Sequence, residues 1–314
     1  MPVSARLSEI AARYGIYQLL VALTAFAAGM SPEFATTGNL VNLINQSAAL
    51  AILAIGQTFV IAAGLIDLSV GQLLGLVAVL ACDLMGGAQT MVLPAALLAL
   101  AIGGGVGFVN GALYRWLRIH PLILTFGMLS VLQGAIFTYT DQSIGQAAPA
   151  VLWIAGGSIA GIPCALVLIA VGGLGAHHLL KGTRFGLHLR AVGANEENAR
   201  RAGVRVQQIN VAAFVLSGLS AGIAGLIVAG RLGTGYPNAG NGYELDAIVA
   251  VVLGGTSFAG GRATIAGTLA AVLVLSLISN LLNLMEVSAF VQMVIKGGIV
   301  VAAIVVNQPR ARLA

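Results

Sequence analysis

Residues 91–114 read MVLPAALLALAIGGGVGFVNGALY and contain no charged side chain. A helix needs about 20 mainly apolar residues to cross the hydrocarbon core of a bilayer, so this run is long enough to span a membrane. Gly103, Gly107 and Gly111 recur every four residues within it, a spacing typical of closely packed membrane helices. The glycine cluster at 103–107 also suggests a nucleotide-binding loop, but no strand precedes it. The stretch therefore predicts a tightly packed transmembrane helix.

The composition of the whole chain agrees with a membrane location. Of 314 residues, 59% are hydrophobic and 8% are charged, whereas soluble domains carry about 25% charged residues. Most of the surface must therefore contact lipid. The 42 glycines fit the same environment because small residues let helices approach closely. The two cysteines, Cys82 and Cys164, lie in apolar runs and define neither a disulfide framework nor a metal site.

Ten apolar segments are expected to be transmembrane helices of one all-α domain covering residues 1–314. They are residues 15–31, 42–63, 69–87, 91–114, 121–140, 160–180, 208–230, 244–259, 263–284 and 288–307. For the third and the eighth, a broken or re-entrant helix is the alternative. The first segment follows Arg6 and Arg13, and the absence of a small-x-small cleavage site at 34–39 favours a retained helix over a cleaved signal peptide.

The positive charges divide unequally between the two sides that these segments define. With a cytoplasmic N-terminus, the cytoplasmic side holds Arg6, Arg13, Arg115, Arg118, Lys181, Arg184, Arg190, Arg200, Arg201, Arg205, Arg262, Arg310 and Arg312. The other side holds only Arg231, and Lys296 falls inside the last segment. An excess of Lys and Arg in short loops marks the cytoplasmic face. The pattern predicts that both termini are cytoplasmic, and it explains the net charge of +5 without a nucleic-acid partner.

The longest polar segment, residues 181–208, is expected to contain a short cytoplasmic helix. Its signals are, in chain order, Asn195, Glu196, Glu197, Arg200, Arg201 and Gly203. The asparagine is a favourable N-cap, the glutamates suit the first turn, the arginines follow them at i,i+4, and the glycine is a natural stop. A helix this short is marginal in water, so docking onto a partner is one interpretation and an ordinary solvated loop is the other.

Several polar side chains fall at membrane depth, where ionisable groups are costly and are treated first as functional candidates. The candidates for a substrate path or for intramembrane polar contacts are Asn45, Gln57, Asp67, Ser69, Thr125, Glu244, Asp246 and Lys296. Asp67, Glu244 and Asp246 are the possible partners of Lys296. Ion pairing, helix capping and contacts between helices explain these residues as well as substrate binding does.

Motifs for enzymatic chemistry are missing from the sequence. No GxxxxGK[ST] motif occurs, so an ATPase that powers this protein must lie on another chain. No HExxH or CxxC motif occurs either. The histidines lie near expected cytoplasmic helix ends, where they are solvated or interfacial: His120, His177, His178 and His188. Neither catalysis nor metal binding is expected of this chain.

Longer motifs follow one another along the chain. They are GQTFVI at 56–61, IDLSVG at 66–71, HPLILTFGM at 120–128, TRFG at 183–186, the loop at 193–203, PNAGNGYELDAI at 237–248, VLGGTS at 252–257 and GGR at 260–262. Together they resemble the permease subunits of monosaccharide ABC importers, of the ribose and xylose type. The resemblance extends over residues 38–307. Gln57 and His120 depart from residues frequent in that family, and the segment 141–163 matches poorly.

The resemblance implies a role within a larger assembly in the cytoplasmic (inner) membrane of a prokaryote. Two permease subunits, identical or paralogous, would form the pathway, and two cytoplasmic ATPase subunits would bind ATP and Mg. A periplasmic or lipid-anchored sugar-binding protein would deliver the substrate. The loop at 193–203 would be the coupling segment that seats on the ATPase, and this chain would carry no cofactor.

Three other functions also fit the sequence. A permease for branched-chain amino acids shares the general architecture, although the segments 66–71 and 242–248 favour the sugar type. An ion-coupled secondary transporter working alone would use Asp67 and Lys296 as coupling residues. A channel or a structural membrane protein is the third alternative. The sequence does not identify which sugar is transported.

Overall fold

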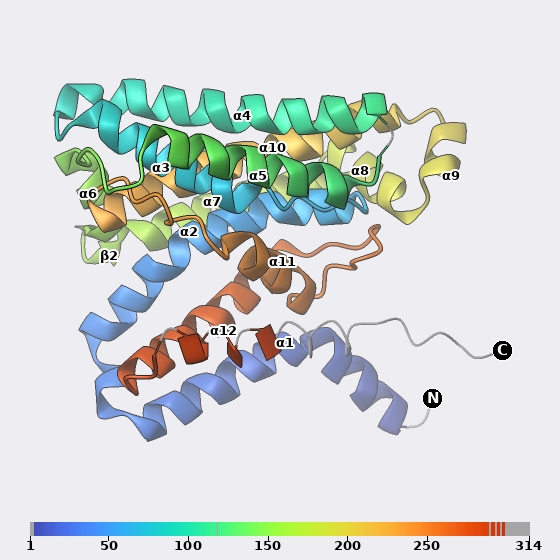
Figure 1. The fold of residues 1–314 in the computed structure, drawn as a ribbon. Coiled ribbons are helices and arrows are strands. Elements are labelled where there is room, and N and C mark those ends of the chain that lie inside the picture. The colour runs from blue at the N-terminus through green and yellow to red at the C-terminus, as the bar shows by residue number, and fades with distance from the viewer. Residues whose placement is uncertain (1–2, 118, 289, 293, 296, 299–314) are drawn as a thin grey trace.

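A computed structural model describes residues 3–117, 119–288, 290–292, 294–295 and 297–298. Its elements, in chain order, are α1 (Val3–Met30), η1 (Pro32–Ala35), α2 (Thr37–Ala62), α3 (Val70–Met85), η2 (Gln89–Met91), α4 (Val92–Leu117), α5 (Pro121–Tyr139), α6 (Pro149–Gly156), β1 (Ser158–Ile159), β2 (Ile162–Pro163), α7 (Cys164–Gly182), α8 (Arg184–Ala194), α9 (Glu196–Arg201), α10 (Val206–Leu232), α11 (Tyr243–Leu253) and α12 (Ile265–Leu284). The expected all-α membrane architecture is confirmed. In Figure 1, α6 and the β-hairpin lie at one end of the bundle and α8 and α9 at the other.

Six helices among the described residues are long and apolar enough to cross a membrane, judged by length and composition. They are α2, α4 together with η2, α5, α7, α10 and α12. Residues 15–30 of α1 and the whole of α3 are apolar but shorter. At 1.5 Å per residue the 16 residues of α3 extend for about 24 Å, so this helix alone is shorter than the hydrocarbon core of about 30 Å.

The predicted span at 244–259 differs from the structure. Only Tyr243–Leu253 is helical, and these 11 residues extend for about 16 Å, roughly half of the hydrocarbon core. The helix stops at Gly254, and the following Gly255 takes φ +91°, a conformation that glycine adopts without strain. The prediction of a continuous helix over 244–259 is therefore wrong. Lys296 and most of the predicted last span, 288–307, lie outside the described residues.

The centre of the bundle is formed by α2 and α10. The most apolar window of α2 is 83% buried, whereas those of α4 and α5 are each 22% buried. Helix α10 packs against α4, α2 and α3, and its Phe214 is among the largest fully buried side chains. The outer helices therefore present apolar faces that suit lipid or another subunit.

Helices α4 and α10 meet backbone to backbone along a row of glycines. A Cβ atom added at Gly103 would collide with the carbonyl of Gly218, and one added at Gly107 would collide with the carbonyl of Phe214. The same is true in reverse of Gly218 against Gly103. The packing role predicted from the four-residue glycine spacing is confirmed, because only glycine permits this approach.

Candidate functional site

The chain leaves helical geometry between α2 and α3 and turns back into the bundle. Gly64, at φ +78°, makes the turn, and no helix forms again before Val70. Non-helical backbone at membrane depth is tolerated where protein satisfies its polar groups. Here Gln57 Nε2 of α2 donates to the carbonyl of Asp67 at 3.2 Å, and the amide of Leu68 donates to Thr125 Oγ1 of α5 at 3.1 Å. We call residues 64–69 the inner re-entrant segment.

The carboxylate of Asp67 is the centre of a buried hydrogen-bond network. Asp67 is 1% exposed. Its Oδ1 accepts from the amide of Ser69 at 3.0 Å and from Ser69 Oγ at 2.6 Å, and its Oδ2 accepts from Ser217 Oγ of α10 at 3.1 Å. Asn110 Nδ2 of α4 in turn donates to Ser69 Oγ at 2.9 Å. The network ties the start of α3 to α4 and α10.

The structure thus brings four of the sequence candidates together in one cluster: Gln57, Asp67, Ser69 and Thr125. All four are fully buried, so in this conformation they hold the bundle together and line no open passage. Sequence reasoning missed two further members, Asn110 and Ser217. The first is the only amide in the apolar run 91–114, which could have identified it, whereas a serine in a glycine-rich helix carries no such signal.

Asp67→Ala is expected to destabilise the protein, because it leaves buried donors of Ser69 and Ser217 without their acceptor. An orphaned buried donor costs about 1–3 kcal/mol, so a loss of at least about 2 kcal/mol is expected. Asp67→Asn keeps one acceptor oxygen and should lose less. Thermal unfolding of the purified protein measures both, with the exposed Asp141→Ala as control. An unchanged midpoint for Asp67→Ala would contradict this role.

A second non-helical stretch, residues 233–242, enters the bundle from the opposite end, after α10. We call it the outer re-entrant segment. Gly240 packs against the backbone of Gly71 and Gly75 on α3, and Gln72 Nε2 donates to Asn241 Oδ1 at 2.8 Å. The outer re-entrant segment therefore packs against the first turns of α3, which directly follow the inner re-entrant segment. Glu244 lies here as well, packed beside Gly71, with its Oε2 buried and without a hydrogen-bond partner among the described residues.

A small polar cavity opens next to the outer re-entrant segment. Its volume is about 170 Å³, and its polar lining consists of Gln46, Arg231, Asn241, Tyr243, Asp246, Ser276 and Ser279. These amide, hydroxyl and charged groups can donate to and accept from the hydroxyl groups of a small polar ligand. Asp246 is the sequence candidate that lines this cavity. Asn45 does not line it, and its Oδ1 is buried without a partner in the described chain.

Helix α9 has the features expected of the short cytoplasmic helix. Asn195 Oδ1 caps it by accepting from the amide of Asn198 at 2.8 Å. Arg200 pairs with Glu196 at 2.6 Å and with Glu197 at 3.3 Å, and Arg201 pairs with Glu197 at 2.9 Å. Gly203 follows the last turn at φ +83°. The predicted cap, ion pairs and stop are confirmed, and the charged side chains are 46–75% exposed.

One buried residue anchors α9 to the rest of the molecule. Ala199 is 4% exposed and packs with Val192 of α8 and Val206 of α10. The last turn of α8, which precedes α9, packs directly against the end of α2. A Cβ atom added at Gly193 would collide there with the carbonyl of Ala62. That same carbonyl accepts from the amide of Gly261 at 3.0 Å. The short helix is therefore connected through α8 to the point where the inner re-entrant segment begins.

An apolar helical bundle with non-helical segments that enter it and a buried polar network is typical of membrane transport proteins. Residues 39–304 match the family model described as the permease component of the branched-chain amino acid transport system, and the chain belongs to this family. No solved structure matched the chain.

Several relatives match nearly the whole chain. The ribose import permease protein RbsC of Escherichia coli K12 is 38% identical over 93% of this chain and 92% of its own length. The L-arabinose ABC transporter permease protein AraH of Azospirillum brasilense is 36% identical over 95% and 88%. The D-allose transport system permease protein AlsC of Escherichia coli K12 is 32% identical over 94% and 91%.

Proposed function

We propose that this chain is the permease subunit of an ABC importer that moves a monosaccharide or a related polyol into the cell. The observation that carries the proposal is the similarity, over nearly the whole chain, to permeases named for ribose, arabinose and allose. The polar cavity beside the outer re-entrant segment supports it, since its lining suits a polyhydroxylated ligand. Specificity would rest mainly on the protein that delivers the substrate.

The partners follow from the similarity to ABC importer permeases. Because this chain has no Walker motif, ATP and Mg would be bound by a separate ATPase at the end of the bundle where α9 lies. A second permease copy or a paralogue would complete the pathway. A periplasmic or lipid-anchored sugar-binding protein would dock at the opposite end, formed by α6 and the β-hairpin. The setting would be the cytoplasmic membrane of a prokaryote.

The orientation with both termini in the cytoplasm, and the count of ten spans, also belong to this proposal. The end of the bundle that carries α9 holds the exposed side chains of Arg115, Lys181, Arg184 and Arg205. An excess of positive charge marks the cytoplasmic side. The tenth span would be the segment 288–307, and α11 with the outer re-entrant segment would together take the place of the eighth.

Coupling would run from α9 into the bundle. ATP binding would close the ATPase subunits and move α9, and the contact of Gly193 with the end of α2 would pass this movement to the inner re-entrant segment. The permease would alternate between two conformations. This requires that ATP and the loaded binding protein each bind one conformation more tightly than the other. The Asp67 network would stabilise the closed packing of α3, α4 and α10 between transport events.

Uptake into liposomes that contain the permease, its ATPase and its binding protein tests the proposal. Labelled ribose, arabinose, allose, galactose and leucine are offered with and without ATP inside. We expect one sugar to accumulate only with ATP, and leucine to stay at background. Accumulation of leucine alone would favour an amino-acid permease. Sugar uptake by the permease without the ATPase would favour a secondary transporter.

A further inference from the structure

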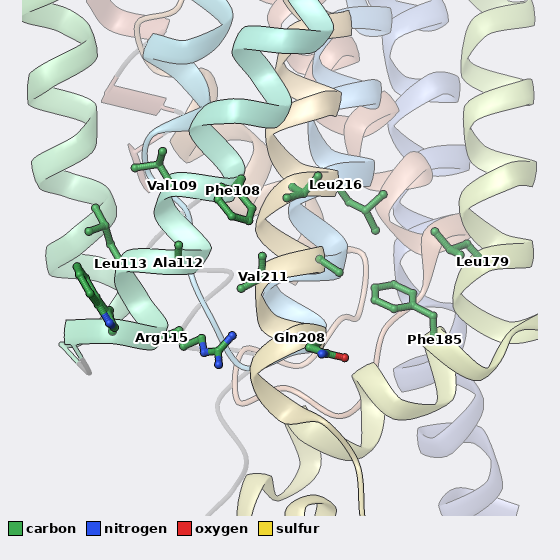
Figure 2. A pocket seen from close by; sticks show the side chains of 13 residues that line it. Phe108, Val109, Ala112, Leu113, Arg115, Leu179, Phe185, Gln208, Val211 and Leu216 are labelled. Carbon is green, nitrogen blue, oxygen red and sulfur yellow. The ribbon is translucent and has the colours of Figure 1, made fainter.

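An apolar groove crosses the outer surface of the bundle near the end that carries α9. It encloses about 970 Å³ and is formed by α4, α7, α8 and α10. Phe108 and Ala112 of α4, Val211 and Ala212 of α10 and Phe185 of α8 line it. Figure 2 shows Phe108, Ala112, Val211 and Phe185 around the space between these helices. The side chain of Phe108 is 58% exposed although it is wholly apolar, so the groove is not filled by this chain.

Polar and basic groups occur at one end of this groove. Figure 2 shows Arg115 and Gln208 together there, below the apolar side chains. A neighbouring hollow shares these two residues and adds Arg205. Neither Arg115 nor Arg205 forms an ion pair with another described residue, whereas Arg200, which borders the same hollow, is paired with Glu196 and Glu197. Two arginines without an ion pair to another described residue therefore lie where the apolar groove ends.

In the orientation proposed above, on which this inference rests, the groove lies in the cytoplasmic half of a bilayer. Phe108 precedes the end of α4 at Leu117 by nine residues, or about 13 Å. Trp116 is 84% exposed at the rim, and an exposed tryptophan at a helix end is typical of the membrane–water interface. The apolar part of the groove thus lies at the depth of acyl chains, and the arginines lie at the depth of lipid headgroups.

We propose that this groove is a binding site for an anionic phospholipid of the inner leaflet. The acyl chains would lie along Phe108, Ala112 and Val211, and the phosphate would accept hydrogen bonds from Arg115 and Arg205. Arginine binds phosphate in a bidentate, charge-assisted manner, and basic pockets between helices on the cytoplasmic side are suited to anionic headgroups. A protein surface would need acidic side chains opposite the arginines and an apolar ridge to fill the groove. A phospholipid combines both features in one molecule.

Native mass spectrometry of the assembled transporter tests the site, after exchange into phosphatidylglycerol or phosphatidylcholine. We expect phosphatidylglycerol to be retained preferentially. Each arginine near the surface contributes about fivefold in affinity, so the double variant Arg115→Gln with Arg205→Gln should reduce retention well over tenfold. Arg262→Gln, an exposed arginine outside the groove, removes the same charge and should change nothing. Equal retention of both lipids, or an equal loss in the control, would overturn the proposal.

A second variant tests the apolar part without changing charge. Ala212→Leu fills the groove and should reduce lipid retention, whereas Ala101→Leu on the exposed face of α4 should not. A photo-reactive phenylalanine analogue at Ala112 then identifies the occupant in the complete transporter. A phospholipid adduct supports the assignment. An adduct with the ATPase or with a second permease copy would show that the groove is a protein interface and would overturn it.

Discussion

Transport and binding-protein-stimulated ATP hydrolysis are both expected to be lost when the charged residues of α9 are changed to alanine. The substitutions are Glu196→Ala, Glu197→Ala, Arg200→Ala and Arg201→Ala together. Their ion pairs are exposed, and exposed pairs within a helix contribute only about 0.3–0.5 kcal/mol each. Alanine also has the highest helix propensity. The helix and the bundle should therefore remain folded while the surface offered to the ATPase disappears.

The expected decrease is tenfold or more, since truncation of a hot-spot residue costs about 2 kcal/mol or more of binding free energy. Reconstituted uptake and ATP hydrolysis measure it, and size-exclusion chromatography checks that the permease is intact. A charge exchange, Glu196→Arg with Arg200→Glu, keeps an internal pair but reverses the charges that a partner meets. If α9 docks, the exchange also uncouples transport. Normal coupling in both variants would show that α9 is an ordinary solvated turn.

Gly107→Leu is expected to prevent stable assembly of the bundle. The Cβ of any larger residue at this position would meet the carbonyl of Phe214 and the Cα of Val215 on α10. Overpacking a core costs about 1–3 kcal/mol when side chains can adjust, and here the obstacle is backbone, which cannot rotate away. We expect a loss above about 3 kcal/mol, seen as a low yield of monodisperse protein and a lower unfolding midpoint.

Gly105 provides the matched control on the same helix. It is exposed, and no atom lies within 4 Å of a Cβ added there. Leucine is also a better helix former than glycine, by nearly 1 kcal/mol. Gly105→Leu should therefore leave the unfolding midpoint unchanged or raise it. Equal destabilisation by both substitutions would contradict the backbone-to-backbone packing of α4 and α10, because of these two glycines Gly107 faces α10 and Gly105 does not.

Hydropathy located the helices well, because lipid requires long apolar segments whose backbone groups are bonded internally. Local rules were also sufficient for α9, since its cap at Asn195 and its ion pairs join residues at most four positions apart. Close helix packing was evident from the glycine spacing. These features depend on near neighbours in the chain or on the surrounding solvent, so the sequence by itself determined them.

The re-entrant segments and the sites built around them were decided only by the tertiary structure. The inner segment is not helical, and side chains of α2 and α5, Gln57 and Thr125, hydrogen-bond its backbone from distant parts of the chain. The partners of Asp67 on α10 and of Ser69 on α4, Ser217 and Asn110, come from equally remote parts of the chain. The half-length of α11 has the same origin. So does the placement beside an apolar groove of Arg115 and Arg205, which form no ion pair with another described residue. A buried polar group needs a hydrogen-bond partner, and a cluster of charges needs several charged residues. These residues come from distant parts of the chain, so only the packing of the whole chain brings them together.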